Sequence, residues 1–292
     1  MSYRRAITTR LRVPGGRWLH VVEHRPQVCF GPTLVLESGL GLSRLLWART
    51  VPRLTAQGMT VVTYDRAGLG LSPPTGRGRP LRELTGDLLH VVASRAGSGA
   101  ILVAHSYGAI LARHAAALRP ELVTGLVLIE PSTERILAEA SLPGRMIDAA
   151  VQGLLVAAYR LGGGGAVLDA SGFRHLPRNL RRRVRAEDSD AATVRSRGHE
   201  LFHYPQALMS LAANPLPAPA VPVTVLRARG PSAWAWAAYE YASAVPNGRV
   251  MVARTRSHMV PLTDPGSVVR AVVSTATRRR MAPEDLPARD GR

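Results

Sequence analysis

The chain has 292 residues, of which 46% are hydrophobic, so it can bury the core of one large α/β domain or of two small domains. This composition excludes a wholly disordered protein. The formal net charge is +18, but all 38 basic residues are arginine and no nucleic-acid-binding signature accompanies them. We therefore attribute the charge to a compositional bias and expect no nucleic-acid partner.

Membrane, secretory and disulfide-rich classes are also disfavoured. No uninterrupted apolar run is long enough to span a bilayer, and the first residues do not lead into the apolar stretch of a secretory signal. The single cysteine, Cys29, excludes a disulfide framework and a cysteine-based metal site within one chain. We expect a cytoplasmic protein without a membrane span, a metal ion or an organic cofactor. The sequence does not indicate an oligomeric state.

Strand and helix patterns alternate through the first half of the chain. The segment 11–22 has the pattern of a β-hairpin with a Pro-Gly-Gly turn. Four short apolar strands follow at 33–36, 60–64, 101–104 and 126–129, and helical periodicity occurs at 47–57, 81–96 and 107–118. Because uninterrupted apolar strands between helices are typical of a parallel sheet covered on both faces, this half predicts an α/β fold.

The alternation is interrupted at 132–218, where no convincing strand occurs and apolar residues recur at helical spacing, most clearly over 146–159. It resumes with strands at 223–226 and 250–253, a helix at 233–244 and a further helix that begins at Asp264-Pro265. The predicted organisation is one α/β core of residues 1–131 and 219–280, an inserted helical cap at 132–218 and a disordered tail at 281–292.

A serine occupies the predicted turn between the strand at 101–104 and the helix that follows it. The sequence Ala104-His105-Ser106-Tyr107-Gly108 has Ser106 at its apex, between small residues that allow a sharp turn to pack. Such a turn exposes the hydroxyl, and the adjacent helix N-terminus favours the negative charge of an oxyanion. The pattern predicts a nucleophilic serine; a serine that only caps the helix is the structural alternative.

Four motifs in the same chain order resemble those of the α/β-hydrolase superfamily. They are Leu36-Glu37-Ser38-Gly39-Leu40-Gly41, Tyr64-Asp65-Arg66-Ala67-Gly68-Leu69-Gly70-Leu71-Ser72, Ala104-His105-Ser106-Tyr107-Gly108 and Ser257-His258-Met259-Val260-Pro261. The resemblance covers residues 10–135 and 218–278. It implies the α/β-hydrolase fold, a mostly parallel twisted sheet with helices on both faces and an inserted helical cap, and it supports Ser106 as the nucleophile.

The resemblance also implies the partners of Ser106. His258 stands where the family carries its general base, and a neutral imidazole must take the hydroxyl proton because a hydroxyl is a poor nucleophile at neutral pH. The family's oxyanion hole maps to the backbone N–H groups of Leu40 and Tyr107. The side chain of His105 is expected to point away from the site.

The acid of the triad is assigned to Glu130. Many relatives carry the acid after the strand predicted here at 223–226, but no Asp or Glu occurs from Arg227 through Tyr239, and Glu240 lies well inside a predicted helix. Other family members place the acid at the end of the preceding strand, which here ends at Glu130. A strand-end carboxylate that pairs with a surface arginine is the alternative.

Four further residues of these motifs are expected to have structural roles. Asp65 and Arg66 resemble the family's structural turn, which braces neighbouring loops. Glu37 is expected to form a buried polar link, and Ser38 stands where many relatives carry a histidine.

Together these residues predict a serine hydrolase that acts on a small-molecule acyl substrate through an acyl-enzyme. The expected substrate is a neutral or hydrophobic ester, thioester, lactone or amide. A serine nucleophile argues against haloalkane dehalogenase and epoxide hydrolase chemistry, which in this fold relies on aspartate. The alternatives are an acyltransferase, cyclase or peptidase that uses the same residues, a non-catalytic small-molecule binder on the same scaffold, and an arginine-driven nucleic-acid binder.

Overall fold

The computed structural model describes residues 5–134, 173–231 and 233–280, together with the isolated positions 154, 157 and 161. Most of the predicted helical stretch at 146–159 and the whole of the predicted tail at 281–292 lie outside the described residues.

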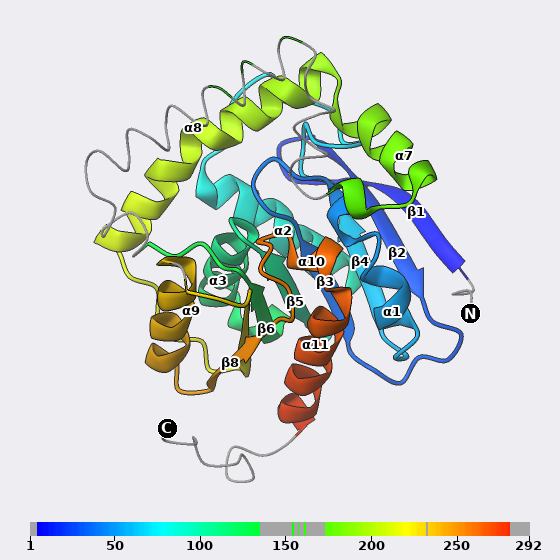
Figure 1. Ribbon diagram of the computed structural model, residues 1–292. Coiled ribbons are helices and arrows are strands. Elements are labelled where there is room, and N and C mark those ends of the chain that lie inside the picture. Colours follow the sequence, from blue (N-terminus) through cyan, green and yellow to red (C-terminus); the bar gives the residue numbers. More distant parts are fainter. Residues whose placement is uncertain are drawn as a thin grey trace.

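An eight-stranded sheet forms the centre of the molecule (Figure 1). Its strands lie in the order β1-β2-β4-β3-β5-β6-β7-β8. The first two strands form an antiparallel hairpin that joins β4 antiparallel, and the strands from β3 to β8 run parallel to one another. The strands are β1 (Arg5–Arg12), β2 (Trp18–Arg25), β3 (Thr33–Glu37), β4 (Thr60–Tyr64), β5 (Ala100–His105), β6 (Val123–Ile129), β7 (Val223–Arg227) and β8 (Gly248–Val252). This mostly parallel sheet confirms the predicted fold class.

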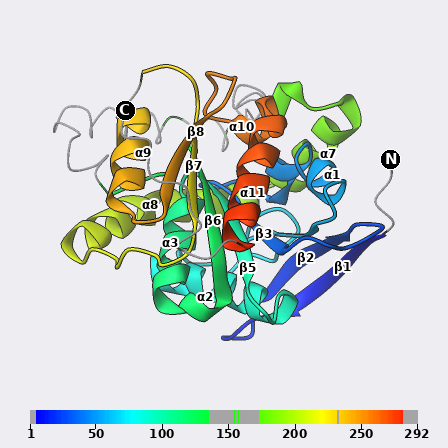
Figure 2. The same cartoon turned by 90° about the horizontal axis from the view of Figure 1, so that it is seen from below.

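Helices cover both faces of the sheet (Figure 2). One face packs against α2 (Leu81–Arg95), α3 (Gly108–Leu118) and α9 (Ala233–Ala244), and the other against α1 (Val51–Thr55), α10 (Val260–Thr263) and α11 (Pro265–Arg280). Three short 3-10 turns are also described: η1 (Arg44–Trp47), η2 (Pro120–Leu122) and η4 (Phe173–His175), the last of which lies between β6 and β7. None of the helices within the described ranges is long and apolar enough to cross a membrane.

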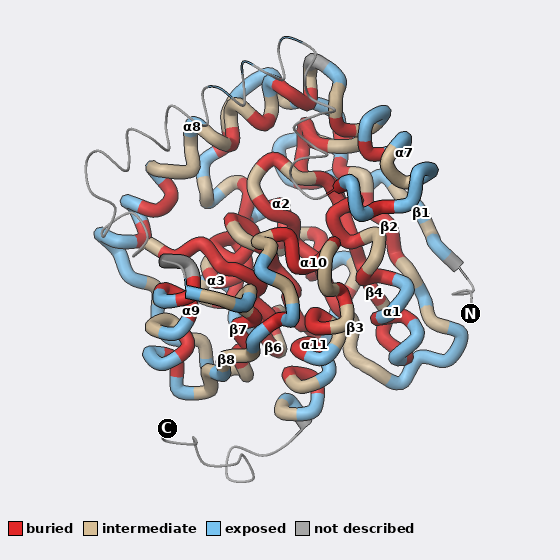
Figure 3. The backbone as a smooth tube through the Cα atoms, viewed as in Figure 1, coloured by how far each residue is buried: buried red, intermediate tan, exposed pale blue. Residues whose placement is uncertain are grey.

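The central strand β5 explains why the strands are apolar on both sides. All six of its residues are buried, and Figure 3 shows buried backbone through the centre of the molecule. Successive strand residues point to opposite faces, so Ile101 and Val103 pack with α11 while Leu102 and Ala104 pack with α2 and α3. Each buried aliphatic side chain stabilises the fold by about 1.5–3 kcal/mol relative to exposure, so a polar residue on either face of β5 would destabilise the core.

One predicted helix is divided in the structure. The pattern at 47–57 predicts a single helix, but the chain forms η1, a short break and then α1. Pro52 accounts for the break, because its ring lacks an N–H and clashes with the carbonyl four residues earlier in a continuous helix. Pro52 is tolerated in the first turn of α1, where its missing N–H has no partner to lose.

The segment between β6 and β7 supplies two described helices, α7 (Arg178–Asp188) and α8 (Ala191–Ala213). Asp190 caps α8, since its side chain accepts from the first free N–H groups of that helix. Residues 173–222, which directly precede β7, contain no strand. Helix α8 passes over the carboxyl ends of the parallel strands, where it contacts the loops after β3, β4 and β5 (Figure 1). The larger division into core and cap stays a prediction.

Candidate active site

Ser106 lies at the apex of the turn from β5 to α3. Its φ is 53°, in the left-handed region that a non-glycine residue adopts only at a cost. Two backbone hydrogen bonds hold it there: the Ser106 N–H donates to the Ile129 carbonyl at 2.9 Å, and the Ser132 N–H donates to the Ser106 carbonyl at 3.1 Å. The strained backbone is therefore enforced by the end of β6 and the residues that follow it.

Gly108, the first residue of α3, brings the turn against the end of β3. A Cβ at this position would lie 2.6 Å from the Ser38 carbonyl oxygen and 2.8 Å from the Glu37 carbonyl oxygen. Glycine is therefore required by space here, and its backbone φ is not positive. The turn that carries Ser106 and the loop after β3 thus lie in direct contact.

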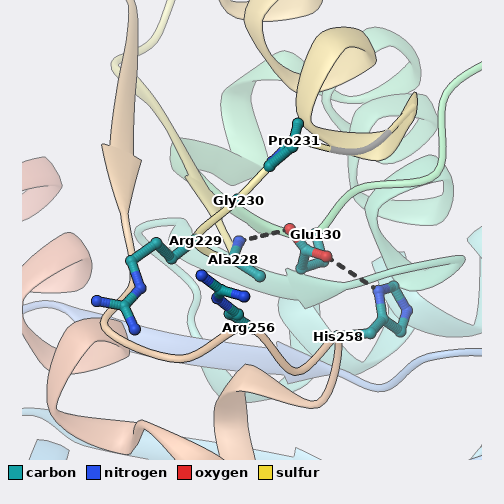
Figure 4. A pocket seen from close by; sticks show the side chains of 7 residues that line it. All are labelled: Glu130, Ala228, Arg229, Gly230, Pro231, Arg256 and His258. Carbon is teal, nitrogen blue, oxygen red and sulfur yellow. Dashed lines mark hydrogen bonds and ion pairs between the residues drawn. The ribbon is translucent and has the colours of Figure 1, made fainter.

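Glu130 and His258 form a hydrogen-bonded pair (Figure 4). His258 Nδ1 lies 3.3 Å from Glu130 Oε2, and Glu130 Oε1 accepts the Ala228 N–H at 2.6 Å. The Glu130 side chain is 6% exposed and that of His258 is 40% exposed. A carboxylate at Nδ1 holds the proton on that nitrogen and leaves Nε2 as the acceptor, which is the tautomer that a general base needs.

The loop after β7 supports the acid and does not supply it. It offers the backbone N–H of Ala228 to Glu130 and supplies no carboxylate. Glu130 itself has a φ of 45°, so the residue at the end of β6 is a second non-glycine residue in the left-handed region.

The orientation of the His105 side chain differs from the one expected from the sequence. Its ring does not point away from the predicted site; it is buried beneath the His258 loop, with Nε2 2.9 Å from the His258 carbonyl oxygen and ring centroids 4.8 Å apart. Burial, followed by the charge of His258, lowers the pKa of His105 to about 3. A neutral ring that bonds a carbonyl must donate from Nε2, so His105 supports the backbone of the loop that carries His258.

The loop after β3 contains Leu40, one of the two predicted oxyanion donors. Within the part of the chain that the structure describes, neither the Leu40 N–H nor the Tyr107 N–H has a hydrogen-bond acceptor. Ser38 braces this loop, since its hydroxyl donates to the Ser43 carbonyl at 3.0 Å and accepts from Trp47 Nε1 at 3.0 Å. Two backbone donors on contacting loops are thus left available for a ligand.

Arg66 is the centre of a buried ionic cluster beside this loop. Its guanidinium donates to Glu37 Oε1 at 2.5 Å and to the carbonyls of Ser38 and Gly39 at 2.8 and 2.7 Å. It also pairs with both carboxylate oxygens of Glu200 on α8, at 2.7 and 2.8 Å. Arg66 therefore braces the loop, as its motif predicted, and Glu37 is a buried polar link.

Glu200 is the residue of this cluster that sequence reasoning missed. It lies 134 positions from Arg66 in a charged helix, so no local pattern marks it. A second link between α8 and the same loop was also missed: Arg197 Nε donates to the Gly41 carbonyl at 2.5 Å.

A pocket of about 440 Å³ opens beside the Glu130–His258 pair (Figure 4). Arg229 and Arg256 extend into its lining from two neighbouring loops. Among the described residues, no carboxylate lies within ion-pair distance of either guanidinium. Its lining residues are Glu130, Ala228, Arg229, Gly230, Pro231, Arg256 and His258. Within the described ranges, no three His, Cys, Asp or Glu side chains are grouped so as to hold a metal ion.

Comparison with known proteins identifies the family. The model of the "Alpha/beta hydrolase family" matches residues 34–271. Epoxide hydrolase B of Mycobacterium tuberculosis is 32% identical over 114 residues, which are 38% of this chain and 32% of that protein. The "Putative carbamate hydrolase RutD" of Pseudomonas syringae pv. syringae is 29% identical over 267 residues, which are 85% of this chain and 95% of that protein.

A solved structure shows the same fold. The "putative epoxide hydrolase from Pseudomonas aeruginosa" superposes with a TM-score of 0.76 at 20% identity and covers 95% of this chain and 97% of its own. The sequence match with the epoxide hydrolase of Mycobacterium tuberculosis spans about a third of that protein's length, 32%. The family model, by contrast, extends from β3 into α11 and includes every residue of the candidate site. The chain therefore belongs to the alpha/beta hydrolase family.

Proposed function

We propose that the protein is a serine hydrolase that cleaves a small acyl substrate through a covalent acyl-enzyme. The observation that carries this proposal is the strained, left-handed Ser106 at the strand-to-helix turn, because such strain persists at sites where a side chain must be presented to a ligand. The hydrogen bond between Glu130 and His258 supports the same assignment.

In the proposed mechanism Ser106 Oγ attacks the acyl carbonyl while His258 Nε2 takes the hydroxyl proton. The N–H groups of Leu40 and Tyr107 donate to the oxyanion of the tetrahedral intermediate. His258 then gives its proton to the leaving group, and water repeats the sequence on the acyl-enzyme. Glu130 stabilises the imidazolium in both halves of the reaction.

The nature of the nucleophile separates this proposal from epoxide hydrolysis. When an aspartate opens an epoxide, the product is an ester with a carbonyl that water attacks. If Ser106 opened the same ring, the product would be an ether, which offers no carbonyl for water and would not turn over. A serine in this position therefore favours a substrate that brings its own acyl carbonyl, as a carbamate, ester, thioester, lactone or amide does.

The residues around Ser106 and His258 extend the proposed substrate class. Residues 132–218 form the proposed cap, in which Tyr204 of α8 packs edge-on against Tyr107 at 5.4 Å between ring centroids. The pocket beside His258 carries the guanidinium groups of Arg229 and Arg256. We therefore add acyl substrates with an anionic group to the neutral and hydrophobic ones expected from the sequence.

A fluorophosphonate probe and a panel of acyl esters and thioesters test the proposal. The wild-type protein is expected to be labelled and to hydrolyse at least one ester, while Ser106→Ala loses labelling and about three orders of magnitude or more in turnover. Ser94→Ala, on α2, is the matched control and keeps both. Near-full activity of Ser106→Ala on every active substrate would refute the acyl-enzyme. Acyl transfer to an added alcohol in place of water would indicate the acyltransferase alternative.

A further inference from the structure

The two peptide groups that flank Leu40 are both held by the ion pair between Arg66 and Glu200. The Gly39 carbonyl accepts from Arg66 Nη2 at 2.7 Å, and the Gly41 N–H donates to Glu200 Oε2 at 2.8 Å. Glu200 in turn receives Arg66 through both of its oxygens. One pair of side chains thus holds the peptide before Leu40 and the peptide after it.

These contacts determine where the Leu40 N–H points. A peptide group is planar, and in the trans form its C=O and N–H point in opposite directions. The described backbone contains no cis peptide, so the Gly39 carbonyl and the Leu40 N–H are opposite ends of one rigid unit. A guanidinium that holds the carbonyl on one side therefore turns the Leu40 N–H toward the other, and the bond from Gly41 to Glu200 limits rotation of the next peptide.

Helix α8 grips this loop at a second point. Arg197 stands three residues before Glu200, on the same face of the helix, and donates to the Gly41 carbonyl at 2.5 Å. Gly41 has a φ of +64°, and a Cβ there would lie 2.9 Å from Arg197 Cγ, so the loop and the helix are in tight contact. Both the N–H and the carbonyl of Gly41 are thus bound by side chains of α8.

The ion pair is buried, and it is charged. Arg66 is 2% exposed and Glu200 is 6% exposed. Burial raises the pKa of Glu200, but the Arg66 guanidinium, with its hydrogen bonds and that of Gly41, outweighs burial, so the pKa of Glu200 lies below its ordinary range. Glu200 is therefore a carboxylate at neutral pH, and removing its charge would leave the Arg66 guanidinium with one fewer buried counter-ion.

We propose that Glu200 is a positioning residue for the oxyanion hole: through Arg66 and Gly41 it aims the Leu40 N–H at the developing oxyanion. The inference rests on the proposed function, since it assumes that Leu40 is an oxyanion donor. Its consequence is that the oxyanion hole is complete only while α8 of the proposed cap is seated on the loop after β3. The cap then contributes to transition-state stabilisation as well as to enclosure of the substrate.

The test compares Glu200→Gln with Glu187→Gln. Glu187 is a matched control because it also joins the proposed cap to a core arginine, Arg44, at 2.7 Å, while Arg44 bonds Asp65 and, among the described residues, none of residues 39–41. Each variant is assayed for kcat and KM on a short ester and for the Kd of phenylboronic acid, which forms a tetrahedral adduct with an active-site serine. The Kd of the ester is measured in the Ser106→Ala background, where no turnover removes it.

We expect Glu200→Gln to lower kcat, and to weaken the binding of phenylboronic acid, by about ten- to a hundredfold each. This loss is no larger than the one expected when a whole oxyanion donor is removed. The ester Kd should change by less than about threefold, because the ground-state carbonyl gains little from the hole. Glu187→Gln should leave kcat and the boronic acid Kd within about twofold. Glu200→Asp, which keeps the charge but shortens the reach, should fall between Glu200→Gln and the wild type.

Three results would overturn the inference. Unchanged kcat and boronic acid Kd in Glu200→Gln would mean that Leu40 is positioned without it. Equal losses in Glu200→Gln and Glu187→Gln would mean that both carboxylates only hold the cap. If Glu200→Gln lacks the native circular dichroism spectrum, Glu200→Asp is compared with the wild type instead. An unchanged kcat and an unchanged boronic acid Kd in Glu200→Asp would likewise refute the inference. Failure of the proposed function is a separate result: the wild type itself then neither hydrolyses an ester nor reacts with a fluorophosphonate.

Discussion

The two halves of the proposed site are held by different parts of the molecule. The nucleophile and its base belong to the carboxyl edge of the sheet, where the Ser106 N–H bonds the Ile129 carbonyl of the adjacent strand. The oxyanion half belongs to the loop after β3, which is bound from the other side by α8, for example through Gly41 and Glu200. The sheet edge follows from strand register; the oxyanion loop depends on a helix far away in the sequence.

This difference predicts two kinds of lesion. A change at the sheet edge removes a group that forms or breaks bonds with the substrate, so it should reduce turnover whatever the cap does. A change at the contact with α8 leaves those groups in place and alters only the stabilisation of charge in the transition state. Substitutions confined to one half therefore separate the two contributions.

Beyond Ser106 itself, the largest effect is expected for Glu130→Gln. An amide keeps the shape of the side chain but can donate to the imidazole and hold the wrong tautomer, so kcat should fall by about two to four orders of magnitude with little change in KM. Glu240→Gln, on α9, is the control and should cost less than about tenfold. Both variants are measured by steady-state kinetics on the best ester of the panel. If Glu240→Gln loses its activity while Glu130→Gln stays active, the acid lies after the later strand, β7.

The sequence predicts more of the sheet half of the proposed site than of the contact between α8 and the oxyanion loop, for a physical reason. The serine at the turn after β5 and the absence of a carboxylate after β7 are local features of the sequence, and with the family resemblance they predict Ser106 and Glu130. Glu200 is recognised only through an ion pair with Arg66 across 134 positions, and helical periodicity carries no information about such a partner. The position of His105 was missed because strand alternation gives a direction but not the loop that folds over it.

A smaller loss of turnover is expected from Gly39→Ala, which would crowd the contact between the loop after β3 and the ring of His105. A Cβ on Gly39 would lie 2.8 Å from His105 Nδ1, and that ring is held in place by the His258 carbonyl. The loop must therefore shift by a few tenths of an ångström or displace His105. We expect kcat to fall by about tenfold with a smaller change in KM, because a small displacement of an oxyanion donor weakens its bond to the transition state.

Gly86→Ala is the control for this change, since Gly86 lies in α2 and a Cβ there meets nothing within 4 Å. It should keep full activity and raise the melting temperature slightly, because alanine is the better helix former. Equal kinetics for Gly39→Ala and the wild type would show that the loop adapts without affecting the donor.

The cap contact also predicts a pH effect on stability. Burial raises the pKa of Asp188 from its ordinary value of 3.8 to about 7, although Arg197 and the Ser43 hydroxyl oppose it. Between about pH 4 and pH 7 the folded state retains a proton that the unfolded state has lost, so this carboxyl makes stability fall as pH rises through that window and adds no further slope above it. The Asp188 carboxyl lies at the contact between α7, α8 and the loop after β3.

Asp188→Asn removes this titration while keeping an acceptor for the Ser43 hydroxyl, which donates to Asp188 at 2.8 Å. Urea unfolding from pH 4.5 to 8 should show the variant gaining stability relative to the wild type as pH rises toward 7, with a constant difference above it. A difference that does not vary with pH would mean that Asp188 is ionised throughout the range.

The smallest effect is expected at the pocket of the sheet half. Arg229 and Arg256 are exposed, so water and salt screen their attraction for a ligand, and each is expected to contribute a few-fold to the affinity for an anionic acyl substrate. Arg256→Gln should raise KM about two- to fivefold for an ester that carries a carboxylate and leave KM for its neutral analogue unchanged. The effect should shrink in 0.5 M salt, where the Debye length is about half its value at physiological ionic strength.

Arg53→Gln is the control, because Arg53 is an exposed arginine on α1 outside this pocket and its loss lowers the net charge by the same amount. It should change KM for neither substrate. Equal shifts in the two variants would assign the effect to the overall charge of +18, and the pocket would then have no part in recognising the anion.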